Sequence, residues 1–189
     1  ASRRSSPSPR WATPAGFERR VSAEREAPTW QPAYVGLGSN LGDSVAQIER
    51  ALAALRALPD TRVIAVSSLY RSKPFGPVMQ GDFVNAVAAL VTTQSLRAFF
   101  TMLRALETPL GRRPSAERWG PREIDLDLLA FGALQCCDHD LVVPHPGIPE
   151  RDFVLYPLRD VAPDLHLPGM GVVSRLAASV PDRGLQRLA

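Results

Sequence analysis

The stretch Ile124-Asp-Leu-Asp-Leu-Leu-Ala-Phe131 is followed directly by a glycine. Apolar and acidic residues alternate in its first half, which predicts a β-strand over residues 124–131 with two unlike faces. One face would present isoleucine and leucine to a core. The other would carry Asp125 and Asp127, with their Cα atoms about 6.6 Å apart.

The two aspartates need an explanation, because aspartate is depleted in strands and two carboxylates on one face repel each other. A bound hard cation would relieve that repulsion. A carboxylate pair with few other protein ligands suits Mg²⁺ that also carries nucleotide phosphates. A solvated polar face on an edge strand, or pairing with arginine side chains, would explain the pair equally well.

Upstream of this strand, local patterns predict further elements. The expected elements in chain order are strand 33–37, helix 45–55, strand 62–70, strand 83–91, helix 96–106 and strand 124–131. Asp43 or Ser44 would cap the first helix, and Ser95 would cap the second. This β-α-β-β-α-β order predicts an α+β fold of the ferredoxin-like class, with an antiparallel sheet and both helices packed on one face of it.

The two ends of the chain differ from this core. Residues 1–32 hold six Arg, five Ser and five Pro but few apolar residues, so we expect a disordered tail. Residues 33–189 would form a single domain, with a C-terminal extension after the core. Seven prolines between positions 144 and 181 leave room only for short helices in that extension.

Composition narrows the class of protein. Hydrophobic residues make up 45% and charged residues 22%, as in globular proteins. The net charge of +3 comes wholly from residues 1–32, so the body is neutral and a nucleic-acid-binding role loses support. The longest apolar runs are too short to span a membrane. Because Cys136 and Cys137 are adjacent, they cannot staple distant segments, and we expect a cytoplasmic protein.

Two loops are candidates for phosphate binding. The first, Gly36-Leu-Gly38-Ser-Asn-Leu-Gly42, has a spacing that fits neither the dinucleotide fingerprint nor a P-loop, and its glycines would also suit a tight turn with positive φ. The second, residues 111–122, carries four arginines. It suits a lid that closes over phosphates, or a solvated basic loop that pairs nearby acids. Further on, His145 lies in a proline-rich segment, where a lone histidine is more often structural.

In combination these segments are more specific than any one of them alone. The motif Arg118-Trp-Gly-Pro-Arg122-x-x-Asp125-Leu-Asp127-Leu-Leu resembles the signature of the 6-hydroxymethyl-7,8-dihydropterin pyrophosphokinase family of the folate pathway. Further segments agree in order: Gly36-x-Gly38-Ser-Asn-Leu-Gly42, Phe83-x-Asn85-Ala86, Val143-Pro144-His145 and Arg151-x-Phe153-Val-Leu-x-Pro157-Leu158. The resemblance covers roughly residues 33–168, and it implies the ferredoxin-like core of that family.

The resemblance implies transfer of pyrophosphate from ATP to the hydroxymethyl group of the reduced pterin, with release of AMP. Asp125 and Asp127 would hold two Mg²⁺ ions that bridge the phosphates. Arg112 and Arg122 would join these aspartates as catalytic residues, and the loop around Arg112 would close over the phosphates. The partners would be these small-molecule substrates. We expect a monomer with no nucleic-acid or membrane partner.

The resemblance also implies two sets of binding residues. The pterin would be held by Ser72, Lys73, Pro74, Phe75, Phe83, Asn85, Asp125 and Phe153. ATP would be held by Glu107, Arg118, Trp119, Arg122, Leu128, His145 and Arg151. Aromatic faces and an amide suit a flat bicycle with amide-like donors and acceptors. The chain departs from the family pattern at Pro114, Asp140 and Pro146, near the nucleotide end.

The main rival is a non-catalytic ferredoxin-like module that binds anions or RNA, since this fold hosts many functions. It predicts a basic body and aromatic side chains exposed on the sheet. The body is neutral, and without metal the aspartate pair would repel phosphate. A degenerate homologue kept as an interaction partner is a second rival, against which the retained aspartates and Asn85 argue. A dinucleotide oxidoreductase fails on the glycine spacing.

Overall fold

The computed structural model describes residues 29–77, 79–111 and 120–188, so nearly all of the expected tail lies outside the described residues. The helices are α1 (Ser44–Arg56), α2 (Leu96–Glu107), α3 (Asp152–Val161) and α4 (Val173–Ser179), with a 3₁₀ turn at Ile148–Glu150. The strands are β1 (Gln31–Ser39), β2 (Thr61–Val66), β3 (Tyr70–Ser72), β4 (Phe83–Thr92), β5 (Asp125–Phe131), β6 (Cys136–Cys137), β7 (Val142–Val143), β8 (His166–Leu167), β9 (Gly171–Val172) and β10 (Gln186–Arg187). Within these three segments, no helix is long and apolar enough to cross a bilayer.

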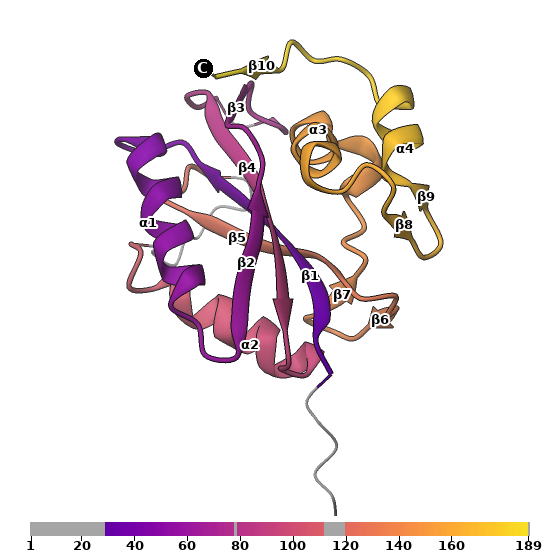
Figure 1. The fold of residues 1–189 in the computed structure, drawn as a ribbon. Coiled ribbons are helices and arrows are strands. Elements are labelled where there is room, and N and C mark those ends of the chain that lie inside the picture. The colour runs from indigo at the N-terminus through magenta and orange to yellow at the C-terminus, as the bar shows by residue number, and fades with distance from the viewer. Residues whose placement is uncertain (1–28, 78, 112–119, 189) are drawn as a thin grey trace, which may run out of the picture.

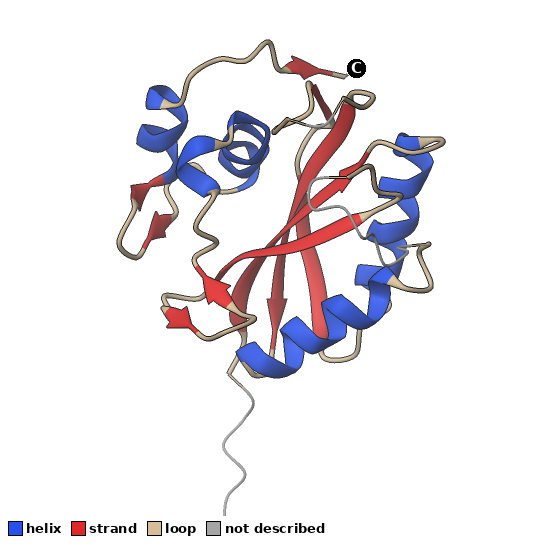
Figure 2. Ribbon diagram, turned by 180° about the vertical axis from the view of Figure 1, so that it is seen from behind, coloured by secondary structure: helices blue, strands red, loops and turns tan. Residues whose placement is uncertain are grey.

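The molecule has three layers, with an antiparallel sheet between two pairs of helices (Figures 1 and 2). α1 and α2 cover one face of the sheet, while α3 and α4 lie on the other. The strand order is β10-β3-β4-β1-β5, and β2 also pairs with β4. The prediction of a mixed fold of helices and antiparallel sheet is confirmed, and both predicted helices lie on the same face.

Strand β1 is longer at both ends than the sequence pattern predicted. It begins at Gln31, so its first two residues belong to the sheet and not to the tail. The expected glycine turn is wrong for Gly36 and Gly38, which lie inside the strand because β1 pairs with β4 on one side and β5 on the other. Only the last glycine of that motif, Gly42, has a positive φ, at 64°.

The strand predicted over residues 62–70 is two short strands. β2 pairs with one half of β4 and β3 with the other half. At the break, the Ser67 side-chain oxygen accepts a hydrogen bond from the Val87 amide at 2.9 Å, and the Ser67 amide donates to the Val87 carbonyl at 2.9 Å. A side chain thus replaces one backbone partner, and the chain leaves the regular ladder there.

The face under α1 and α2 is a closed hydrophobic core. Ile48 and Leu55 of α1 and Phe99 and Leu103 of α2 are fully buried against the apolar side of β1, β4 and β5. The predicted caps are also present: Asp43 accepts a hydrogen bond from the Ala46 amide, and Ser95 does so from Ala98. Burial and caps explain why periodicity alone located both helices.

The opposite face is covered only in part, by the C-terminal extension. α3 and α4 bury Leu155, Leu158 and Ala177 against the sheet residues Val87 and Leu129. Both helices described here are short, as expected: α3 has ten residues, among them a buried proline, and α4 has seven. Burial of the apolar face of α3 outweighs the single backbone hydrogen bond that this proline cannot donate.

Candidate active site

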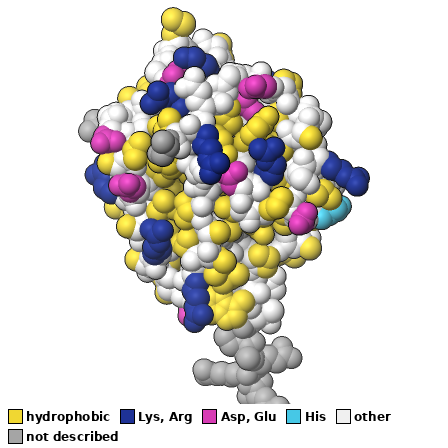
Figure 3. Space-filling model, turned by 45° about the horizontal axis from the view of Figure 1, so that its top comes forward, with side chains coloured by type: hydrophobic (Ala, Val, Ile, Leu, Met, Phe, Trp, Pro, Cys, Tyr) yellow, Lys and Arg dark blue, Asp and Glu magenta, His cyan; other side chains and the backbone are white. Residues whose placement is uncertain are grey.

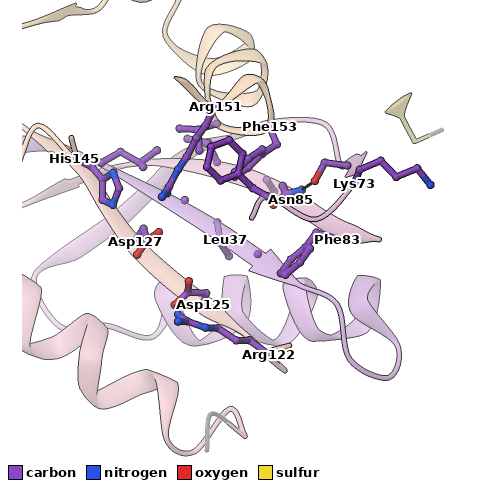
Figure 4. A pocket seen from close by; sticks show the side chains of 18 of the residues that line it. Leu37, Lys73, Phe83, Asn85, Arg122, Asp125, Asp127, His145, Arg151 and Phe153 are labelled. Carbon is purple, nitrogen blue, oxygen red and sulfur yellow. Dashed lines mark hydrogen bonds and ion pairs between the residues drawn. The ribbon is translucent and has the colours of Figure 1, made fainter. Parts of the chain in front are cut away.

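A cavity of about 300 Å³ occupies the part of the sheet that α3 and α4 leave uncovered. Its walls come from β1, β4 and β5, the loops that precede β4 and β5, and the start of α3 (Figure 4). The lining residues that the sequence had singled out are Ser72, Lys73, Phe75, Phe83, Asn85, Arg122, Asp125, Asp127, His145, Arg151 and Phe153. The cavity brings together segments up to 118 positions apart in the chain, from Gly36 to Val154.

The floor of the cavity combines glycines with carboxylates. In the register of β1 and β5, Gly36 lies beside Asp127 and Gly38 beside Asp125. A Cβ on Gly36 would lie 3.4 Å from the Leu129 side chain. Both glycines line the cavity, so the strand next to the aspartates presents bare backbone to it.

The two aspartates have different surroundings. Asp125 forms an ion pair with Arg122, with Nη1 and Oδ1 2.8 Å apart. Burial raises the pKa of Asp127, and the neighbouring charge of Asp125 raises that pKa further. The sequence had left open whether arginine or a cation balances the pair, and in the structure an arginine pairs with Asp125.

The donor set fits a hard cation that brings other ligands with it. Mg²⁺ is bound by carboxylate oxygens and typically keeps waters or substrate phosphates in its remaining positions. Among the described residues there is no cluster of three or more His, Cys, Asp and Glu side chains that could hold a metal ion. Asp125 and Asp127 are therefore a pair of ligands suited to Mg²⁺ that arrives with a polyphosphate.

Cationic and imidazole groups border the acidic floor. His145 accepts a hydrogen bond on Nδ1 from the Gly147 amide at 3.0 Å. Burial lowers the pKa of His145, and nearby Arg151 lowers it as well, while Asp127 opposes them. A neutral imidazole that accepts on Nδ1 carries its hydrogen on Nε2, so His145 can donate to an anion.

The opposite wall is aromatic and carries a fixed amide. Asn85 is buried on β4, and its Nδ2 donates to the Ser72 hydroxyl at 2.9 Å. The rings of Phe75 and Phe153 meet edge to face, with their centroids 6.0 Å apart. Figure 4 shows Phe153 and Asn85 across the cavity from the aspartates, as a slot for a flat polar ring requires.

Three predicted binding residues do not line the cavity, namely Pro74, Glu107 and Leu128. The Glu107 carboxylate is buried, where it accepts a hydrogen bond from the Leu126 amide at 3.1 Å. The Leu128 side chain lies in the core under the helices, because it alternates with Asp127 along β5. A role of Leu128 in ATP binding stays a prediction, and its side chain does not face the cavity. Arg112, Arg118 and Trp119 lie outside the described residues.

Sequence reasoning gave no role to Asn40, which shapes the site. The Asn40 side chain accepts from the Arg122 amide at 2.8 Å, and its Nδ2 donates to Gln80 Oε1 at 2.9 Å. It thereby joins the loops before β4 and before β5, each of which supplies lining residues. Asn40 stands in the quoted glycine motif, but nothing in its local pattern indicates two distant partners.

One departure from the family pattern has a structural role. Asp140 lies beside the short strands β6 and β7 and receives two hydrogen bonds from Arg97 of α2, at 2.8 and 2.9 Å. Arg97 also pairs with Asp138 at 2.7 Å. The acidic residue at position 140 thus fastens this hairpin to α2.

This α+β fold has a cavity with carboxylates and cations on one side and aromatic rings on the other, which suits small molecules with a flat ring and an anionic part. A family model described as 7,8-dihydro-6-hydroxymethylpterin-pyrophosphokinase (HPPK) matches residues 34–163. The chain belongs to this family.

Several curated proteins resemble the chain over most of its length. A protein of Pseudomonas aeruginosa is 48% identical over 158 residues, which cover 84% of this chain and 97% of that protein. A protein of Methylorubrum extorquens is 42% identical, with coverage of 82% and 98%. Both are named 2-amino-4-hydroxy-6-hydroxymethyldihydropteridine pyrophosphokinase.

Solved structures resemble the fold. The wild-type HPPK-DHPS of Plasmodium falciparum with pteroate superposes with a TM-score of 0.63 at 13% identity. The match covers 81% of this chain and 43% of that longer chain. At this identity the likeness shows the fold alone.

Proposed function

We propose that this protein transfers pyrophosphate from ATP to the hydroxymethyl group of 6-hydroxymethyl-7,8-dihydropterin, giving the pterin diphosphate and AMP in folate biosynthesis. Family membership supports the reaction. The observation that carries the proposal is a single cavity that joins Asp125 and Asp127 to the amide of Asn85 and the ring of Phe153. A phosphate-binding end and a ring-binding end thus share one space.

The pterin would lie at the aromatic end. Phe83 and Phe153 line this part of the cavity and would contact the two faces of the ring. Asn85 would read the polar edge of the ring, with its orientation set by the hydrogen bond to Ser72. A buried amide that is already oriented loses little entropy on binding, so it discriminates well between rings with different donor patterns.

The triphosphate would lie at the acidic end. Asp125 and Asp127 would hold two Mg²⁺ ions, which would neutralise the phosphate charge and polarise the oxygens around the attacked phosphorus. Arg122, Arg151 and His145 border the same space and would donate hydrogen bonds to the phosphates. Burial and the charge of Asp125 destabilise the ionised form of Asp127, so binding of a cation beside it would be favourable.

In this reaction the pterin hydroxymethyl oxygen attacks the β-phosphorus, and the bond from that phosphorus to the oxygen of the leaving AMP breaks. The cavity residues would act mainly by position, as in phosphoryl transfer generally. The aromatic wall would fix the pterin, and the cationic groups would fix the phosphate chain. Exclusion of water from the closed site would favour transfer over hydrolysis of ATP.

We further infer that the core belongs to the ferredoxin-like class and that residues 33–189 act as one pyrophosphokinase domain. If β2 and β3 count as one broken strand, the order of the sheet is second-third-first-fourth, which supports the split β-α-β arrangement. β10 belongs to the same sheet as β3 and β4, and the start of α3 lines the same cavity as residues of these two strands. Both observations support a single unit.

The rival of an RNA-binding module is not favoured. On the face shown in Figure 3, Lys and Arg side chains are separated by acidic and apolar ones and form no continuous basic surface. Residues 33–189 carry no net charge. An RNA-binding face needs clustered positive charge along the track of the phosphates.

The decisive experiment is incubation of the protein with Mg²⁺-ATP and the reduced pterin, followed by separation of the nucleotides. AMP should form in step with the pterin diphosphate, and only when the pterin is present. Omission of the pterin and addition of a chelator serve as controls. Formation of ADP, or AMP that does not depend on the pterin, would contradict the proposal.

A further inference from the structure

The last described residues of the chain return to the sheet beside the cavity. After α4, the chain passes the start of α3 and forms β10, which pairs with β3 (Figure 1). Beyond β10, the Leu188 amide donates to the Leu69 carbonyl at 2.8 Å. Residues 181–188, which we term the C-terminal strap, therefore connect α4 with the edge strand that leads into the cavity loop at Ser72.

The strap is also attached to the start of α3. The amide of Arg183 donates to Asp152 Oδ2 at 3.0 Å, while Oδ1 of the same carboxylate accepts from the Phe153 amide at 2.8 Å. Asp152 is only 2% exposed, so this carboxylate lies in a protected position. One buried carboxylate thus holds together the strap and the backbone that carries the aromatic ring of Phe153.

The side chain of Arg183 reaches the aromatic wall of the cavity. Its guanidinium carbon lies 4.6 Å from the centroid of the Phe75 ring. Arg151 approaches the same ring at 5.7 Å, and Phe153 meets it edge to face at 6.0 Å. Of these two arginines, Arg183 from the strap therefore lies nearer to the Phe75 ring.

Phe75 needs such contacts, because its backbone has no regular structure. It lies between β3 and β4, next to Gly76 at a φ of 116° and two prolines, in a segment without ladder hydrogen bonds. In such a segment the orientation of the ring depends on side-chain neighbours. A guanidinium within about 6 Å of an aromatic centroid attracts the ring face.

We propose that Arg183 is a positioning residue for the pterin-binding wall: its guanidinium holds the ring of Phe75 against Phe153. This inference rests on the proposed function. Arg183 lies 20 positions beyond residues 34–163, which the family model matches, so the wall is completed from outside the matched region. Arg183 is exposed and is not among the residues that line the cavity itself.

The test compares Arg183→Ala with the wild type in binding and in steady-state kinetics. Loss of one cation–π contact should raise the Kd and the KM for the reduced pterin between about twofold and fivefold. The kcat, the KM for ATP and the melting temperature should stay unchanged, because the strap keeps its backbone hydrogen bonds. Arg183→Lys should retain most of the affinity, since an ammonium group also attracts the ring.

Two further variants make the result specific. Arg175→Ala removes an exposed arginine of α4 and should change nothing. In a Phe75→Leu background, which has no aromatic face at this position, Arg183→Ala should no longer weaken pterin binding. Equal effects of Arg183→Ala in both backgrounds, or a parallel loss of ATP affinity, would overturn the proposal.

The outcomes also separate this inference from the proposed function. If the wild type neither binds the reduced pterin nor forms AMP, both fail together. If the wild type is active and Arg183→Ala binds pterin as tightly as the wild type, the positioning role alone is wrong.

Discussion

The two faces of the sheet are built from the same strands but differ in what covers them. On one face, α1 and α2 close over leucine, isoleucine and phenylalanine side chains, so that this core is sealed. On the other face, α3 and α4 cover only part of the sheet, and the remainder forms the floor of the cavity. Because neighbouring residues of a strand point to opposite faces, residues that pack in the core alternate along the strand with residues that face the cavity.

Strand β5 shows this division most clearly. Leu126 and Leu128 face the sealed core, whereas Asp125 and Asp127 face the cavity. Leu129 continues this alternation onto the open face, but a bulge, where the register against β1 shifts, places the next residue, Ala130, on that face as well. The bulge therefore marks the boundary between the acidic floor and the apolar contacts of α3.

The largest effect should follow from a change on the cavity face. Asp127→Asn keeps the size of the side chain but removes its charge, and we expect kcat to fall by about 10³-fold or more. AMP formation under saturating Mg²⁺-ATP and pterin would measure the loss. Asp164→Asn, an exposed site in the extension, is a matched control that should keep full activity. Wild-type turnover in Asp127→Asn would remove the metal role.

At neutral pH and without Mg²⁺, the same variant should be more stable than the wild type, because it lacks the buried charge of Asp127. Burial and Asp125 raise the pKa of Asp127, so the folded state resists ionisation and loses stability as the pH rises past the unfolded value near 3.8. Without Mg²⁺, Asp127→Asn should therefore unfold at a higher temperature than the wild type at pH 7. The difference should vanish toward pH 3, where both states of the wild type are protonated.

A change at the neighbouring core residue Leu126 should have the opposite pattern, with a loss of stability and little loss of activity. Leu126 is 1% exposed in the sealed core, and Leu126→Ala should lower the free energy of unfolding by about 3 kcal/mol through lost burial and a cavity. The carboxylates on the other face remain in place, so kcat at a low, permissive temperature should stay within about twofold of the wild type. Denaturant unfolding and AMP formation on one preparation would measure both. Large loss of kcat in a stably folded variant would break the contrast between the faces.

How far the sequence predicted this division depends on how local each signal is. Alternation in the first half of residues 124–131 correctly separated core positions from Asp125 and Asp127, because the pleat imposes that pattern directly. Asn85 followed only from the family resemblance, because residues 83–91 are apolar on both faces. Periodicity and capping likewise located α1 and α2. The break at Ser67 was missed, because a side chain there substitutes for a ladder partner and leaves the run of β-forming residues intact.

Contacts between distant segments left no readable pattern. The bulge after Leu128 depends on how β5 meets β1, so nothing in the residues themselves places both Leu129 and Ala130 on the open face. The ring contacts among Phe75, Phe153 and Arg183 join residues up to 108 positions apart. Such contacts are set by tertiary packing, which local propensity does not encode.

A smaller effect should follow from a change in the aromatic wall of the cavity, where we propose that the pterin binds. Asn85→Asp keeps the shape of the side chain, but it replaces the amide donor with an acceptor and adds charge in a buried site. The Kd for the reduced pterin should rise about tenfold or more, because a ring edge matched to an amide then meets a mismatched group. The Kd for Mg²⁺-ATP, measured in parallel, should change by less than about twofold. Equal weakening of both ligands would mean that the change disturbs the whole cavity face.

The smallest effect should come from the polar contact that ties α3 to the open face. The Tyr70 hydroxyl of β3 donates to Asp160 Oδ2 at 2.8 Å, and burial, with this hydrogen bond second, raises the pKa of Tyr70 to about 12. Tyr70→Phe should cost about 1 kcal/mol of stability below pH 10, since Asp160 is exposed to water. Above pH 10 the unfolded tyrosine ionises while the folded one stays neutral, so the wild type loses stability and its advantage over Tyr70→Phe narrows. Chemical unfolding of both proteins from pH 8 to pH 11 would measure the difference. An advantage that stays constant above pH 10 would show that Tyr70 ionises as readily in the fold as in the unfolded chain, so that neither burial nor Asp160 favours its neutral form.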